Sequence, residues 1–144
     1  MPLPKPEPGL VLSYDYLWKW QDETDGDTGD KSRPCVIVLS AENYDGDTIV
    51  MVVPVTGQQP RSGRGSVEIP AQVQAHLGLP GNRSWVIIDE VNKFVWPGPD
   101  LAQIPGQPGR FHYGFIPPKL YKKIIAGCTD IAKAHRLRSV TRTV

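Results

Sequence analysis

Two runs of β-branched residues separated by a tight-turn sequence are the feature that most constrains the fold of this chain. The runs span residues 35–40 and 49–55, and both are rich in valine and isoleucine. Between them, residues 43–47 contain Asp45-Gly46, a dipeptide typical of the two-residue turn of a β-hairpin. We therefore predict that the two runs form neighbouring antiparallel strands.

The rest of the pattern predicts several short strands and a terminal helix. Apolar residues alternate through residues 9–18, which predicts a strand, and further strands are expected at residues 66–69, 84–89 and 91–96. Pro70 is expected to open a short helix that ends at Leu77 and is closed by Gly78. Pro118 is expected to begin an amphipathic helix with a basic tail, and one apolar stripe follows helical spacing: Leu120, Ile124, Cys128, Ile131 and His135.

Proline and glycine also limit the architecture. The chain has 15 Pro and 14 Gly in 144 residues, which excludes an all-helical bundle and favours short elements joined by turns. We predict a single domain over residues 1–144, mainly β with a terminal helix, folded as a small, partly open antiparallel barrel. Two stretches are expected to be irregular: an acidic loop at 19–31 with five carboxylates, and a segment at 97–118 with six Pro and four Gly.

Charge and cysteine content restrict the classes of function. The net charge is +1, but residues 1–109 hold 8 basic and 14 acidic side chains, whereas residues 110–144 hold 8 basic and 1 acidic. No apolar run approaches the ~20 residues of a membrane span or forms the core of a signal peptide. The two cysteines, Cys35 and Cys128, lack zinc-site spacing. We expect a cytoplasmic protein with free thiols, no metal site, no cofactor and no membrane partner.

Arg33 is the first candidate for contact with an anion. It stands immediately before Pro34, which holds the backbone extended, and it precedes a predicted strand, so its side chain should point from the rim of the sheet. The alternative is a solvated charge at the edge of a strand.

A second group of candidates follows the strand at 49–55. Thr56 and Gln58 lie at the mouth of the loop 57–65, which carries Arg61 and Arg64. A phosphate placed there could accept hydrogen bonds from the hydroxyl, from backbone N–H groups and from the guanidinium groups. The alternative is a turn in which Thr56 bonds its own backbone.

Together these segments resemble a known family. The string K-x-R-P-C-V-I-V-L-S at 31–40, followed by V-M-V-V-P-V-T-G-Q at 50–58, resembles the core signature of the MazF/PemK toxin endoribonucleases. Residues 66–69 resemble that family's fourth strand, and residues 86–96 resemble its "D-Q-V" strand pair. The resemblance extends over roughly residues 9–133.

The resemblance implies a fold, partners and a reaction. It implies an SH3-like barrel that forms a homodimer, is restrained by a cognate antitoxin, and contacts DNA only through the antitoxin complex. It implies metal-independent cleavage of single-stranded mRNA, in which the ribose 2′-OH attacks the adjacent phosphorus and leaves 2′,3′-cyclic phosphate and 5′-OH ends. The residues that match the family's catalytic set are Arg33, Thr56 and Asp89. Those that match its RNA-binding set are Gln58, Arg61 and Arg64.

Departures from the family pattern keep two rival functions open. Glu90 stands where the family usually has Gln, Asn92 replaces a common basic residue, and Ile87 is apolar where one branch has an arginine. The acidic loop 19–31 would repel phosphate. The rivals are a CcdB-like toxin that binds DNA gyrase and a catalytically inactive binding module of the same fold. The tryptophans, Trp18 and Trp20 included, are expected in the core or a dimer interface.

Overall fold

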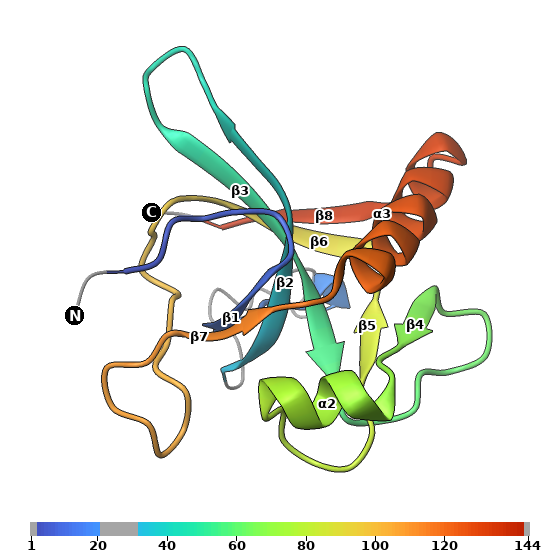
Figure 1. Ribbon diagram of the computed structural model, residues 1–144. Coiled ribbons are helices and arrows are strands. Elements are labelled where there is room, and N and C mark those ends of the chain that lie inside the picture. The colour runs from blue at the N-terminus through green and yellow to red at the C-terminus, as the bar shows by residue number, and fades with distance from the viewer. Residues whose placement is uncertain (1–2, 21–31, 143–144) are drawn as a thin grey trace.

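The computed structural model describes residues 3–20 and 32–142. It is mainly an antiparallel β-sheet with helices at its edges, and Figure 1 shows α3 along one side and α2 below the sheet. The strands and helices are, in chain order: β1 (Leu10–Tyr14), β2 (Arg33–Glu42), β3 (Thr48–Thr56), β4 (Ser66–Glu68), α2 (Ala71–Leu77), β5 (Trp85–Ile87), β6 (Glu90–Val95), β7 (His112–Phe115), α3 (Pro118–Lys133) and β8 (Arg138–Thr141).

The strand order shows an open barrel. The main path runs β4-β5-β3-β2-β1-β7, and β6 pairs with β3 and with β8. In the described part of the chain, β4 and β7 at the two ends of this path do not pair with each other, so the sheet does not close. This confirms the prediction of a mainly β, partly open antiparallel barrel with a helix near the C-terminus.

The predicted hairpin is present. Strands β2 and β3 pair in antiparallel fashion from Cys35 opposite Pro54 to Glu42 opposite Thr48. The Asn43 side-chain oxygen accepts hydrogen bonds from the N–H groups of Asp45 and Asp47, each at 3.0 Å, which fixes the turn. The far end of the hairpin projects from the body of the protein (Figure 1).

The core lies on both faces of the β1–β2–β3 sheet. Val11, Val36 and Val53 point to one face, where Ile124 of α3 packs. Leu12, Tyr14, Ile37 and Phe94 pack together on the other face. Because both faces are covered, alternation of apolar and polar residues is absent from the middle of these strands. The prediction of a buried strand over residues 35–40 is confirmed for its first three residues.

The two predicted helices begin where proline was expected to start them. Gly78 closes α2 in the left-handed conformation, with φ of 67°, as predicted. Helix α3 begins at Pro118 and buries Leu120, Ile124 and Cys128. The prediction for His135 was wrong: it lies beyond the helix, exposed, with φ of 58°, because the chain turns there.

Three expectations about element boundaries are corrected. The first strand ends at Tyr14 and not at residue 18. The irregular stretch 97–118 contains β7, which hydrogen-bonds to β1, because the β1 edge needs backbone partners and residues 112–115 contain no proline. The basic tail is not a helical extension: residues 138–141 form β8, parallel to β6, with Val140 buried.

Three sequence-level expectations bear on the environment of the protein. Cys35 and Cys128 are free and buried, as expected. Within the described ranges, no helix has the length and apolar character needed to cross a membrane. The expected acidic loop falls almost entirely on residues 21–31, which lie outside the described residues.

Candidate functional site

The candidate site is an open cavity of about 760 Å³ where β2 begins and β3 ends. Five of the residues predicted to act on RNA line it, although they come from both strands of the hairpin and from the loop 57–65. These residues are Arg33, Thr56, Gln58, Arg61 and Arg64.

Arg33 enters the cavity from the first residue of β2. The next four residues are buried or paired with β1 and β3, so the strand fixes the direction in which the side chain leaves the sheet. The guanidinium carbon lies 5.0 Å from the centre of the Trp18 ring, a cation–π contact. Its Nε is buried and has no hydrogen-bond partner among the described residues. Arg33 therefore places a positive charge in the cavity, and this charge has no carboxylate partner among the described residues.

Thr56 reaches the cavity from the last residue of β3. Its Oγ1 accepts a hydrogen bond from the Gln58 N–H at 3.2 Å, so the turn that was the alternative interpretation does form. Thr56 also lines the cavity, and its hydroxyl proton can still be donated to another acceptor there. The local turn and a ligand contact are thus compatible.

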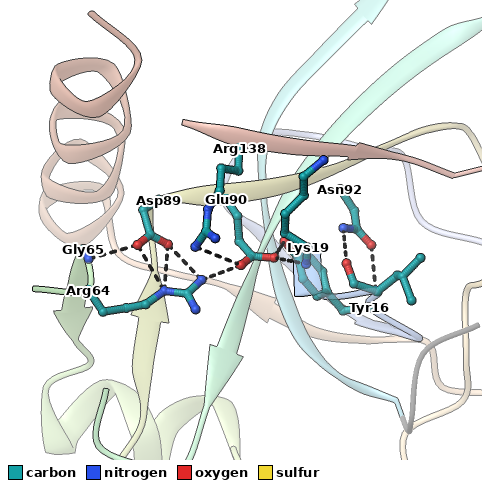
Figure 2. Close-up of polar contacts among 9 residues, drawn as sticks. Tyr16, Lys19, Arg64, Gly65, Asp89, Glu90, Asn92 and Arg138 are labelled. Carbon is teal, nitrogen blue, oxygen red and sulfur yellow. Dashed lines mark hydrogen bonds and ion pairs between the residues drawn. The ribbon is translucent and has the colours of Figure 1, made fainter. Parts of the chain in front are cut away.

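Arg64 is held in place by two acidic neighbours. Figure 2 shows its guanidinium between Asp89 and Glu90. Arg64 Nε donates to both Asp89 oxygens at 2.9 and 3.0 Å, and Nη2 pairs with Asp89 Oδ1 and with Glu90 Oε2. Burial disfavours the charge, but the hydrogen bonds and charges of Glu90 and Asp89 outweigh it, so the pKa of Arg64 lies above its ordinary value. Arg64 is accordingly a fixed and largely neutralised cation.

Asp89 lies behind Arg64. Besides the bonds from Arg64, its Oδ2 accepts the N–H of Gly65 at 3.3 Å (Figure 2). Asp89 does not line the cavity that holds Arg33 and Thr56; it borders a second cavity next to it. The structure therefore brings five of the six predicted residues into one cavity and places the sixth as the support of Arg64.

Two departures from the family pattern fix the segment that carries Trp18. Glu90 is 1% exposed, and its Oε1 accepts the Tyr16 hydroxyl at 3.1 Å and the Lys19 N–H at 3.0 Å. The Asn92 side chain accepts the Leu17 N–H at 2.9 Å and donates to the Leu17 carbonyl at 2.8 Å. These bonds tie residues 16–19 to β6 (Figure 2).

The tied segment carries Trp18, and Trp20 follows directly after it; both were predicted to lie in the core or a dimer interface. Trp18 and Trp20 both line the cavity, and Trp20 is 57% exposed. Trp18 also packs partly on the core, and the Arg64 guanidinium carbon is 5.5 Å from its ring centre. In the sequence, the two tryptophans stand directly before the acidic stretch, next to the segment expected to lie close to the site. The hydrogen bonds that tie residues 16–19 to β6 are visible only in the tertiary structure.

The chemistry of the cavity is that of an anion-binding site. Arg33 and Arg61 make no ion pair in the described part of the chain, and they face the same space as the Thr56 hydroxyl. A phosphodiester would receive charge-assisted hydrogen bonds there. Ile87 contributes an apolar wall, and no carboxylate or imidazole is part of the described lining. Among the described residues, no three His, Cys, Asp or Glu side chains are grouped as a metal site would require.

Fold and cavity together define a class: small, open antiparallel β proteins with an arginine-lined cavity at the ends of a central hairpin. Within that class, the chain belongs to the PemK-like, MazF-like toxins of type II toxin-antitoxin systems, whose family model matches residues 13–94. Membership in such a system implies an antitoxin partner. No curated protein and no solved structure matches the chain.

Proposed function

We propose that this toxin is a metal-independent endoribonuclease that cleaves single-stranded RNA. In this reaction a ribose 2′-OH attacks the adjacent phosphorus, the bond to the 5′-oxygen of the next nucleotide breaks, and the products carry 2′,3′-cyclic phosphate and 5′-OH ends. The observation that carries the proposal is the meeting of Arg33 and Thr56 in one accessible cavity, although they stand 23 positions apart in the chain.

Arg33 suits stabilisation of the transition state. Attack at phosphorus places a second negative charge on the phosphoryl oxygens, and the Arg33 guanidinium, which has no carboxylate partner among the described residues, can donate two hydrogen bonds to them. Cation–π contact with Trp18 holds the arginine without neutralising it. This is the property expected of a group that must interact more strongly with the transition state than with the substrate.

The other residues divide into ligand contacts and support. We assign Thr56 to a non-bridging phosphoryl oxygen, and Gln58 and Arg61 to the bases and backbone of the RNA. Arg64, paired with two carboxylates, supports the wall and orients Trp18. Asp89, with both oxygens engaged by Arg64, acts as a positioning residue and not as the base.

The biological setting follows from the family. We propose a cytoplasmic homodimer that is inhibited when an acidic, disordered antitoxin segment covers the cavity and neutralises Arg33 and Arg61. Carboxylates of such a segment would occupy the same donors as the phosphate, and its proteolysis would release the toxin. Contact with DNA would come through the antitoxin.

The test uses purified protein and a long single-stranded RNA, with and without EDTA. We expect cleavage that survives EDTA and falls on the order of 10²–10³-fold in Arg33→Ala, because one transition-state donor is lost. Lys119→Ala is the matched control, since it removes one exposed charge from α3, away from the cavity. Analysis of fragment ends checks for the cyclic phosphate.

Other outcomes identify the rivals. Inhibition of DNA supercoiling without RNA cleavage would show a gyrase-binding toxin. RNA binding that needs Arg33, without cleavage under any condition, would show an inactive binding module. Cleavage that is equal in Arg33→Ala and in the native protein would contradict the proposed site.

A further inference from the structure

A second cavity adjoins the site and remains unassigned. It has a volume of about 510 Å³ and lies between the loop 57–65, the end of α3 and the start of β8. Arg136, Ile131 and Asp89 line it, and Arg64 and Arg138 form the boundary with the first cavity.

The charge in this second cavity is predominantly positive. Its carboxylate, Asp89, already accepts from Arg64 and from the Gly65 N–H. Arg138 lies 3.8 Å from Glu90, at the outer limit of an ion pair, and its side chain is 47% exposed. Arg136 is exposed and has no side-chain hydrogen bond or ion pair in the described part of the chain. Two guanidinium groups therefore face the cavity with weak compensation.

The two cavities are adjacent. Arg64 and Arg138 each line both of them, so a strand bound in the first cavity has the second as its neighbour on the α3 side. Proteins that bind single strands use positive grooves of this kind to follow the phosphate backbone. Ile131 adds an apolar surface suited to a ribose or a base.

We infer that this second cavity binds another phosphodiester of the same RNA strand, with Arg136 and Arg138 as its ligands. The inference rests on the proposed function and deepens it: the toxin holds its substrate at the cleaved phosphate and at a neighbouring phosphate on the α3 side. An acidic antitoxin side chain is the competing occupant. RNA is favoured because the cavity adjoins the one that contains Arg33 and Thr56 and shares Arg64 and Arg138 with it.

The test compares RNA lengths. Once a cleavage site is mapped on long RNA, oligonucleotides centred on it are shortened in turn from the 5′ and the 3′ end, and KM and kcat are measured. Arg136→Ala should raise KM for the long oligonucleotide about tenfold, roughly the value of one charged hydrogen bond. Its effect should disappear when shortening on one side removes the neighbouring phosphate. The salt dependence of affinity should fall by about 0.7 in slope for one lost contact with single-stranded RNA.

Lys123→Ala is the matched control, because it removes one exposed cation from α3 outside both cavities. Equal increases of KM in Arg136→Ala and Lys123→Ala would overturn the inference, as would an Arg136→Ala effect that is independent of RNA length. An effect on antitoxin binding alone would assign the cavity to the antitoxin and also overturn it.

Failure of the proposed nuclease remains distinguishable. If the protein does not cut RNA, there is no cleavage site to centre oligonucleotides on, so fluorescence anisotropy of one labelled single-stranded RNA, shortened in turn from each end, measures binding directly. A length-dependent loss of affinity in Arg136→Ala would then uphold the second cavity while the nuclease assignment fails. Binding that is the same in Arg136→Ala and the native protein would reject the second cavity.

Discussion

Replacement of Arg64 with methionine removes the guanidinium that lies between Asp89 and Glu90 while keeping a side chain of similar length. The carboxylate of Glu90, 1% exposed, would then face Arg138 at 3.8 Å as its remaining cation in the described structure. Loss of one partner from a buried ion pair costs about 3–5 kcal/mol, because the other charge stays buried without compensation. We expect the free energy of unfolding to fall by that amount at pH 8.

Removal of the acidic partner, by Glu90→Gln, should lower the free energy of unfolding by less. Glu90→Gln leaves Arg64 with Asp89 as a bidentate partner and keeps an oxygen for the Tyr16 hydroxyl, so the loss is that of one charged hydrogen bond, about 1.5–3 kcal/mol. The double variant removes the buried charge as well as its partner. We therefore expect it to be at least about 1.5 kcal/mol more stable than the sum of the single effects predicts, within the range measured for contacting pairs.

Urea unfolding of the four proteins at pH 8 measures these values. A cost below about 1 kcal/mol for Arg64→Met, or additive effects in the double variant, would refute the argument that Glu90 and Arg64 stabilise each other.

Three further predictions concern the same region. Gly65→Ala should destabilise the protein by about 1 kcal/mol in urea unfolding, since a Cβ there would lie 2.8 Å from Ile131 Cδ1 and 3.3 Å from Ile88 Cγ1, so that these neighbours must shift; unchanged stability would contradict this. Burial, and to a lesser degree Asp89, raises the pKa of Cys128 to about 11, so about 0.1% is thiolate at pH 8 and alkylation should need urea; rapid alkylation of the native protein would disprove it. Thr56→Val should lower kcat/KM at least about tenfold with stability changed by about 1 kcal/mol, and Thr56→Ser should restore cleavage; equal activity in all three would exclude the hydroxyl.

The central hairpin and the meeting of its two site residues were open to prediction from the chain alone. Asp45-Gly46 between two β-branched runs determines that these strands pair and brings Arg33 near Thr56. Their exact alignment, in which the Cys35–Pro54 pairing continued by two residues places Arg33 opposite Thr56, depends on a register shift between Ile37 and Leu39 that only the structure shows. Proline and glycine determined the helix boundaries at Pro118 and Gly78 for equally local reasons, since each restricts or permits one backbone conformation.

The walls of the site were decided by tertiary structure. Trp18 lines the cavity because Glu90, more than seventy positions away, accepts the Lys19 N–H and the Tyr16 hydroxyl. Arg138 borders both cavities because β8 adds to the free edge of β6. A four-residue strand with one buried valine, Val140, is too short for periodicity to reveal, and it forms because the edge of β6 needs backbone partners.

Local sequence therefore determined that β2 pairs with β3, where the helices begin and which arginine stands at the rim. Contacts between distant segments decided which of the described arginines are paired with carboxylates. A lone sequence cannot show that Asp89 and Glu90 neutralise Arg64, while Arg33 has no carboxylate partner among residues 3–20 and 32–142, because the pairing of charges depends on distances that are set only when the loop 57–65 packs against β6.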